Sequence, residues 1–165
     1  TVLDELTLGI PQSDKVVCIE THPELRIPLP HVTKFIAETE HGGRHRFKCR
    51  AKLATAVRMK PKWFVVGEIN SPGVFSDLVH LAITGHCFVG TMHAASAVDA
   101  ILRMERNLQV EMPSRSQAYI RKDIASTQPI SVCLHHHAGG HPVRIEACTV
   151  ALDKNEEFVF MPIEF

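Results

Sequence analysis

The sequence predicts an α/β fold with a mostly parallel sheet between helices and antiparallel strands toward the end of the chain. Two short apolar runs, Lys15–Glu20 and Trp63–Val66, are typical of strands covered on both faces of a sheet, and helical spacing alternates with them. After residue 130, strand-like segments are separated by Gly139-Gly140 and Lys154-Asn155, which favour hairpin turns.

The first part of the chain is expected to alternate strands with helices. Gly9 and Pro11 end a first helical segment, and Pro61 ends a later one. The expected elements are a helix tail at Val2–Leu8, a strand at Lys15–Glu20, a proline-rich loop at His22–Pro30, a strand at Thr33–Glu38, a basic loop at His41–Arg46, a helix at Phe47–Met59 and the strand Trp63–Val66.

The second part continues this pattern and then changes to strands. Ser71-Pro72 reads as an N-cap and first turn, and Ser96-x-x-Asp99 as a variant capping box. The expected elements are a helix from Ser71, a strand at Phe88–His93, a helix from Ser96, a helix at Ser114–Thr127 and strands at Ile130–His136, Val143–Leu152 and Glu157–Phe165. Because no repeat or clear linker interrupts them, we expect one domain over residues 1–165.

The composition narrows the classes of function. Basic and acidic residues each number 18, so no overall positive field attracts nucleic acid, and we expect no direct binding to it. No apolar run approaches the ~20 residues that span a bilayer, and the first residues do not read as a signal peptide.

Cysteine and histidine are the candidate metal ligands. The five cysteines are odd in number and lie mostly in or beside apolar runs, which favours buried free thiols in a reducing cytosol over disulfides or a metal site. The cluster His135–His137 with His141 allows a zinc site, but no Cys-x-x-Cys supports it. For these cysteines and histidines, we favour the interpretation without a metal site.

Glu68 is the most informative residue, because it follows an apolar strand through Gly67. Open α/β sheets bind ligands at the carboxyl ends of their strands, where a carboxylate is rigidly held. The alternative is a surface glutamate at a strand end. His93 follows a second apolar run and is expected at the same edge, seven residues after His86.

These segments resemble the bacterial secretion and traffic ATPases, which comprise type IV secretion and conjugation motors, type II secretion motors and pilus motors. In that family the Walker B strand ends in Gly-Glu, as at Gly67-Glu68, and a histidine box T-G-H…[ST]-x-H follows, as at 84–86 and 91–93. The resemblance runs from about Val2 to Val150 and is closest to the type IV secretion branch. It implies a RecA-like motor domain.

The resemblance also implies roles for acids and histidines. Residues 19–25 resemble the family's acidic "Asp box", with acids at Glu20 and Glu24 and a threonine, Thr21, in place of the usual Asp. Glu68, Glu20 and Glu24 would be catalytic, and Glu20 and Glu68 would hold Mg²⁺ through its water ligands. His86 and His93 would sense the nucleotide. A capping or solvated acid is the alternative for Glu20.

Four arginines are candidates for contacts with the nucleotide or a neighbouring subunit. Arg58 precedes Walker B in a segment resembling L-R-M-R-P-D, with Lys62 where Asp is usual, and Arg103 follows the histidine box. Arg44 and Arg46 lie in the basic loop and suit an arginine finger, although a solvated loop is the favoured reading there. Asn70 stands where the family commonly has Arg.

The resemblance further implies ATP and Mg²⁺ as cofactors and a homo-oligomeric ring, of six subunits, on an inner-membrane secretion or pilus complex. The protein would be cytoplasmic and peripheral at the inner membrane. The alternative is a catalytically degenerate paralogue that acts as a structural subunit of the same machinery.

The phosphate-binding loop G-x-x-x-x-G-K-[ST] does not occur in these 165 residues. In the family this loop opens the helix that Val2–Leu8 resembles, so the first strand and the loop are expected upstream, and residues 1–165 as part of a C-terminal ATPase domain. This chain alone is expected to be inactive and to leave unpaired sheet edges. Three explanations stay open: a piece of a longer motor, a degenerate paralogue, or a second chain that supplies the missing half.

Overall fold

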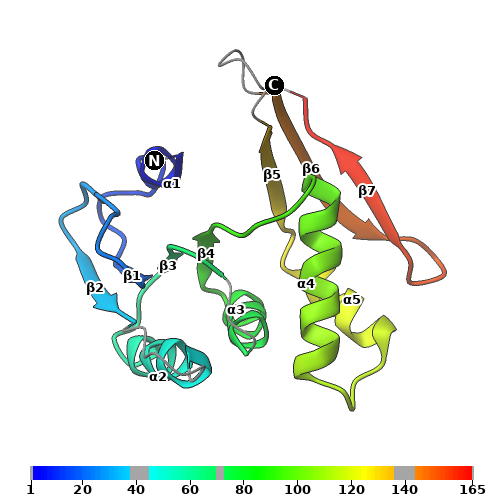
Figure 1. Ribbon diagram of the computed structural model, residues 1–165, viewed down its shortest axis with the longest axis horizontal. Helices are drawn as coiled ribbons and strands as arrows, with labels where there is room; N and C mark the ends of the chain where they lie inside the picture. The colour runs from blue at the N-terminus through cyan, green and yellow to red at the C-terminus, as the bar shows by residue number, and fades with distance from the viewer. Residues whose placement is uncertain (1, 38–44, 70–72, 136–143, 165) are drawn as a thin grey trace. The chain divides into compact units, whose positions relative to one another are not determined.

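The computed structural model describes residues 2–37, 45–69, 73–135 and 144–164, with the side chains of α2 described from residue 51 onward (Figure 1). The chain divides into two compact units, residues 1–92 and 93–165.

Unit 1 holds a four-stranded parallel sheet of order β2-β1-β3-β4. This confirms the predicted alternation of strands and helices. Its elements are α1 (Val2–Thr7), β1 (Val16–Glu20), β2 (Val32–Ile36), α2 (His45–Val57), β3 (Trp63–Val66), α3 (Val74–Ile83) and β4 (Cys87–Gly90).

The core of unit 1 lies around β1 and β3. All five residues of β1 are buried, as are Phe64, Val65 and Val66 of β3, which confirms that these strands are covered on both faces. Leu3 of α1 and Ile10 pack into the cluster around Val16 and Cys18, while Figure 1 shows α2 and α3 on the other side of the sheet.

Several element boundaries in unit 1 differ from the prediction. Strand β2 begins one residue earlier than predicted, and α2 begins at His45, within the segment predicted as a basic loop. Helix α3 begins after Gly73 rather than at Ser71, because Gly73 adopts a φ of 94°, a left-handed conformation that favours glycine, and caps the helix without a side-chain bond. Ser71 and Pro72 lie outside the described residues. Strand β4 covers Cys87–Gly90 and not Phe88–His93, so His86 directly precedes it.

Unit 2 packs two helices against a three-stranded antiparallel sheet of order β5-β6-β7, which confirms the predicted meander. Ser96 is the N-cap of α4 as predicted, since its hydroxyl accepts a hydrogen bond from Asp99 N at 2.9 Å. The elements are α4 (Ala97–Glu111), α5 (Gln117–Ser126), β5 (Ile130–His135), β6 (Arg144–Leu152) and β7 (Phe158–Pro162).

Two sequence expectations concern the whole chain. Within the described residues, no helix has the length and apolar character needed to cross a membrane. Among the described residues, the free thiols Cys18 and Cys148 are buried, as expected, whereas Cys87 and Cys133 are half-buried. The side chain of Cys49 lies outside the described part.

Candidate functional site

The carboxyl edge of the parallel sheet in unit 1 gathers polar groups from three neighbouring strands. Glu20 ends β1, Gly67 and Glu68 follow β3, and Thr91 follows β4. Since Ile19 pairs with Val66 and Val66 with Gly90, the residues that come next in each chain segment lie level with one another. Structure and sequence therefore agree in placing Glu20 and Glu68 at one edge, where open α/β sheets bind ligands.

Glu20 is a buried carboxylate, with only 4% of its surface exposed. Its Oε2 accepts hydrogen bonds from the backbone N–H groups of Glu24 at 3.0 Å and Leu25 at 2.9 Å. Its Oε1 is buried, lacks a hydrogen-bond partner within the described residues and lies 3.7 Å from Lys34 Nζ. One oxygen thus fixes the following turn, and the other keeps its hydrogen-bonding capacity for a further group.

Gly67 is required by the close approach of β1. A Cβ at this position would lie 3.1 Å from Glu20 Cβ, which is tighter than ordinary contacts between side chains. The Gly67 N–H also donates to Ile19 O at 2.9 Å. The space that the sequence leaves beside Glu68 is therefore filled by Glu20.

Glu68 has an exposed side chain on a fixed backbone. On one side of it, Thr91 Oγ1 donates to Gly67 O, and on the other, Ile69 N donates to Thr91 O at 2.8 Å. Thr91 belongs to the histidine-box motif, but the sequence indicates no role for it. No local sequence pattern indicates that Lys34, on the edge strand β2, faces Glu20.

The residues at this edge fit Mg²⁺. Carboxylate oxygens are its preferred protein ligands, and in nucleotide sites it keeps several waters and takes one or two carboxylates together with phosphates. The unpartnered Oε1 of Glu20 and the neighbouring Glu68 supply such a set. Within the described residues there is no group of three or more acidic, histidine or cysteine side chains that forms a complete cage, so these acids suit contacts through water.

His86 lies at the opposite edge of the sheet. It precedes β4, its Nδ1 lies 2.8 Å from Pro61 O, just before β3, and its ring meets the Phe64 ring edge-on at 5.5 Å between centroids. Four residues of strand span about 13 Å. The structure therefore does not bring His86 to Glu68 of the same chain, because T-G-H comes before its strand and not after it.

The four candidate arginines fall in different parts of the chain. Arg58 follows α2 and precedes β3, so it lies at the amino edge with His86. Arg103 is exposed on α4 in unit 2. Arg44 lies outside the described residues, and Arg46 falls in α2 at a position whose side chain is not described.

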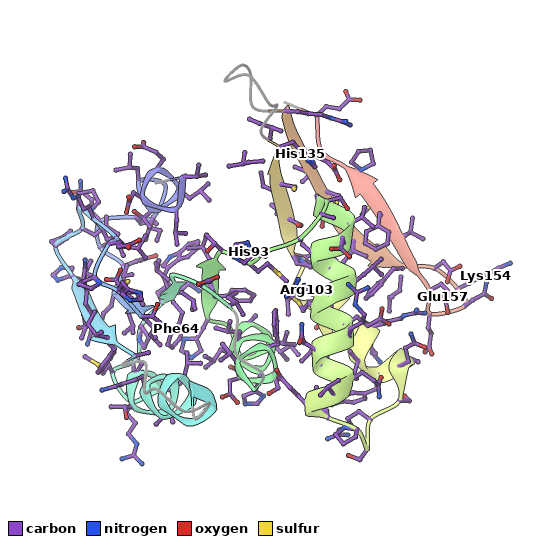
Figure 2. The ribbon with its side chains drawn as sticks, in the orientation of Figure 1. Phe64, His93, Arg103, His135, Lys154 and Glu157 are labelled. Atoms are coloured by element: carbon purple, nitrogen blue, oxygen red, sulfur yellow. The ribbon has the colours of Figure 1, made fainter. Side chains whose placement is uncertain are left out.

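His93 begins unit 2, in the segment that connects β4 to α4, and its side chain is exposed (Figure 2). Glu24 is also exposed, and its backbone N–H bonds to Glu20 Oε2. The described residues that share the carboxyl edge of the sheet are therefore Glu20, Glu68 and Thr91, all in unit 1.

Cys18 lies in β1, two residues before Glu20, and is the cysteine nearest the site in sequence. Burial raises the pKa of its thiol to about 12, and the negative charge of Glu20 adds to this. The thiol is therefore protonated at neutral pH and is a poor nucleophile and metal ligand.

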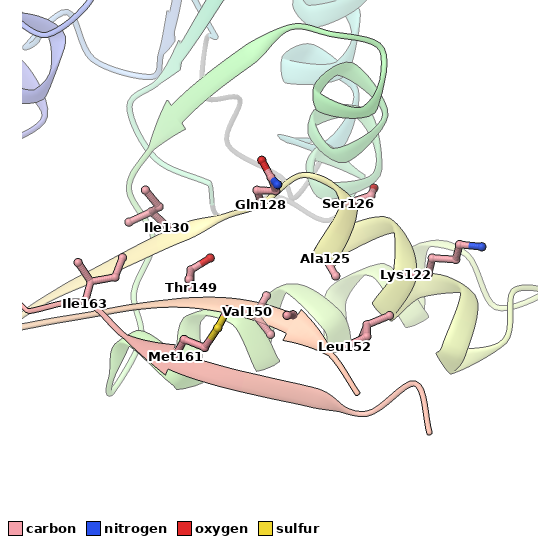
Figure 3. Close-up of a pocket in the computed structure, with 11 residues that line it drawn as sticks. Lys122, Ala125, Ser126, Gln128, Ile130, Thr149, Val150, Leu152, Met161 and Ile163 are labelled. Carbon is pink, nitrogen blue, oxygen red and sulfur yellow. The ribbon is translucent and has the colours of Figure 1, made fainter. Parts of the chain in front are cut away.

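A shallow pocket in unit 2 lies between the end of α5 and the sheet (Figure 3). Apolar side chains such as Ile130, Met161 and Ile163 dominate its lining, and Lys122 is its one charged residue. Without an acid or a histidine in its lining, this pocket offers no general acid or base, so the candidate chemistry lies at the sheet edge of unit 1.

Comparison with solved structures identifies the fold. The VirB11 ATPase of the Brucella suis type IV secretion system aligns with 87% of this chain and 43% of its own, at a TM-score of 0.72 and 20% identity. The ATPase DotB of Legionella pneumophila aligns with 98% of this chain and 39% of its own, at a TM-score of 0.60 and 19% identity. The pilus retraction motor PilT with bound ADP aligns with 82% of this chain and 38% of its own, at a TM-score of 0.60 and 23% identity. The chain has the α/β fold of RecA-like secretion ATPases.

Sequence comparison then defines the family. The profile described as "Type II/IV secretion system protein" matches residues 1–134, and the chain belongs to this family.

Individual relatives cover a smaller part of the chain. A putative conjugal transfer protein of Mycobacterium tuberculosis is 32% identical over 107 residues, which is 64% of this chain and 30% of the relative. The VirB11 protein of Bartonella quintana is 25% identical over 104 residues, 63% of this chain and 29% of the relative. The chain therefore spans about a third or less of the length of these two relatives.

Proposed function

We propose that the protein containing this chain is the ATP-hydrolysing motor of a bacterial secretion, conjugation or pilus system. The observation that carries this proposal is the pair of carboxylates that follow neighbouring strands, Glu20 with an Oε1 that has no hydrogen-bond partner among the described residues and Glu68 on a clamped backbone, at the ligand-binding edge of the sheet. Membership of the family and solved structures named as ATPases support it.

In this proposal Glu68 orients the attacking water in line with the γ-phosphate and accepts its proton. Glu20 and Glu68 would hold Mg²⁺ through its water ligands, and Glu24 adds negative charge next to Glu20. The metal, when bound, neutralises charge on the phosphate oxygens. Gly67 lets the segment after β3 approach the end of β1 closely, since any side chain at residue 67 would press on Glu20.

His93 is proposed to sense the nucleotide, because it follows β4, and β4 pairs with β3, the strand that precedes Glu68. Arg103, Arg44 and Arg46 are proposed to contact the nucleotide or a neighbouring subunit. Arg58 and His86 lie at the amino edge, so we propose that they act away from the Glu68 of their own subunit.

The intact protein is proposed to form a homo-oligomeric ring, of six subunits, on the cytoplasmic side of an inner-membrane secretion or pilus complex. ATP hydrolysis would move domains in this ring and thereby drive transfer of substrate or pilin. These partners follow from the family and from the resemblance to the type IV secretion branch.

A second candidate function is a structural subunit that keeps the fold without turnover. Thr21, Lys62 and Asn70 replace expected charged residues. The structure gives Lys62 a local role, because its Nζ donates to Gly85 O at 3.2 Å after the end of α3. The charge reversal at this position therefore has a structural use that does not involve nucleotide.

The test is Mg²⁺-dependent ATP turnover by the full-length product of the gene that encodes this chain. Glu68→Gln keeps the size of the side chain and removes the base, so we expect turnover to fall about 100-fold or more. Glu156→Gln, in an exposed turn of unit 2, is the matched control and should be unchanged. The 165-residue chain alone is expected to be inactive.

If wild-type protein turns over no ATP, even when assembled with its complex, the motor proposal fails and the structural-subunit function takes its place. Turnover that survives Glu68→Gln at the wild-type rate would remove Glu68 from catalysis.

A further inference from the structure

We infer that Thr91 is a positioning residue, whose hydroxyl fixes the backbone on which Glu68 stands. This inference rests on the proposed function, because it assumes that Glu68 is the catalytic carboxylate. Thr91 does not need to touch the nucleotide for this role.

The contacts of Thr91 enclose Glu68 from both sides. Its Oγ1 donates to the carbonyl of Gly67, the residue before Glu68, at 2.5 Å. Its own carbonyl accepts the N–H of Ile69, the residue after Glu68, at 2.8 Å. Thr91, which directly follows β4, is therefore hydrogen-bonded to both peptide groups that flank Glu68.

The surrounding packing makes this clamp rigid. Gly67 N donates to Ile19 O on the β1 side, so the segment is bonded to both neighbouring strands. Ile69 is 6% exposed, and a Cβ at Gly90 would come within 2.9 Å of Ile69 Cδ1 and of Val66 O. The Ile69 side chain thus packs directly against Gly90 on one side of Glu68. On the other side, the hydroxyl of Thr91 holds the Gly67 carbonyl.

The clamp carries a chemical consequence. Glu68 is exposed, and its carboxylate extends from the backbone that Thr91 bonds on both sides. The direction of the Gly67 carbonyl sets the peptide plane that leads into Glu68, so the backbone determines where the Glu68 side chain begins. Loss of about an ångström of positioning is costly for a general base.

The test compares Thr91→Val with Thr91→Ser in the full-length gene product. Thr91→Val keeps the shape and removes the donor, and we expect kcat to fall about tenfold with the KM for ATP unchanged. Thr91→Ser keeps the donor and should recover to within about threefold of wild type. Thr55→Val is the matched control, because its hydroxyl also donates to a carbonyl, Ala51 O, at an exposed site on α2.

A double-mutant cycle separates positioning from independent action. If Thr91 acts through Glu68, adding Thr91→Val to Glu68→Gln should lower the residual rate no further. An equal tenfold loss in both backgrounds would overturn the inference, as would a kcat for Thr91→Val equal to that of wild type.

Amide hydrogen exchange tests the clamp without reference to catalysis. In Thr91→Val the Ile69 amide should exchange about tenfold faster, while amides of the central strand β1, such as Val17, should not change. Unchanged exchange at Ile69 would overturn the inference even in a protein that hydrolyses no ATP. Failure of the motor proposal is seen separately, in the wild-type turnover.

Discussion

Close approach between backbones, not conformational freedom, explains two glycines at the candidate site. Neither Gly67 nor Gly90 has a positive φ, yet a Cβ at either would press on a neighbouring strand or its side chains. At Gly67 the neighbour is the Glu20 side chain, and at Gly90 it is the carbonyl of Val66. These glycines allow β1, β3 and β4 to carry polar groups side by side at one edge.

We predict that Gly90→Ala lowers the free energy of unfolding by about 1–3 kcal/mol, because the new methyl group overlaps a backbone oxygen that cannot move freely. Gly9→Ala is the control, since a Cβ there would lie 3.5 Å from Leu6 O, an ordinary contact, and should change the value by less than about 0.5 kcal/mol. Urea denaturation of both variants measures the difference, and equal stability for the two would refute the packing argument.

The elements of unit 2 are joined by a charged network around Arg121 of α5. Its Nε donates to Glu105 of α4 at 2.6 Å and its Nη1 to Glu157, beside β7, at 2.5 Å, while its guanidinium lies over the Phe158 ring. Hydrogen bonding to Glu105 raises the pKa of the arginine further. Glu105 is 7% exposed and also accepts from Gln117, so the acid depends on these partners.

We predict that Arg121→Ala costs about 2–3 kcal/mol of stability, since it leaves the Glu105 carboxylate buried without its charged partner. Arg106→Ala is the control on the neighbouring helix α4. Its ion pair with Asp99 is exposed and should contribute little to stability. The comparison is again made by urea denaturation, and a loss for Arg121→Ala no greater than that for Arg106→Ala would show that Glu105 is solvated.

At the scale of the whole molecule, several large apolar side chains are exposed on the described part of the chain. In unit 2, α4 and α5 lie on one face of the sheet, where Ala97 N bonds to Glu146. The pairing register puts Ile130, Val132 and Ile145 together on the other face, with 69%, 45% and 53% of their surfaces exposed. Contiguous apolar surface of this kind favours association.

We predict that the 165-residue chain binds a hydrophobic dye such as ANS and self-associates at micromolar concentration. Val132→Thr together with Ile145→Thr should reduce both effects, because threonine suits a strand but is polar. Val110→Thr is the control, since Val110 is 68% exposed on helix α4 and away from this sheet face. Dye fluorescence and sedimentation velocity measure the outcome, and a monomeric chain without dye binding would contradict it.

The sequence by itself determined the α/β class, the parallel arrangement of the short apolar strands, the C-terminal meander and the Ser96 cap. Each depends on local features, namely apolar period, turn residues and a capping side chain, that are visible within a few residues. For the same reason it could place Glu20 and Glu68 at strand ends.

The tertiary structure alone decided which of the predicted residues meet. His86 and Glu68 are separated because strand direction, set by pairing over long range, puts a residue before β4 at the opposite edge from a residue after β3. The orphaned oxygen of Glu20, the approach of Lys34 and the Thr91 clamp also come from contacts between distant segments. A single sequence does not record such contacts, because they depend on register and on the close approach of backbones at Gly67 and Gly90.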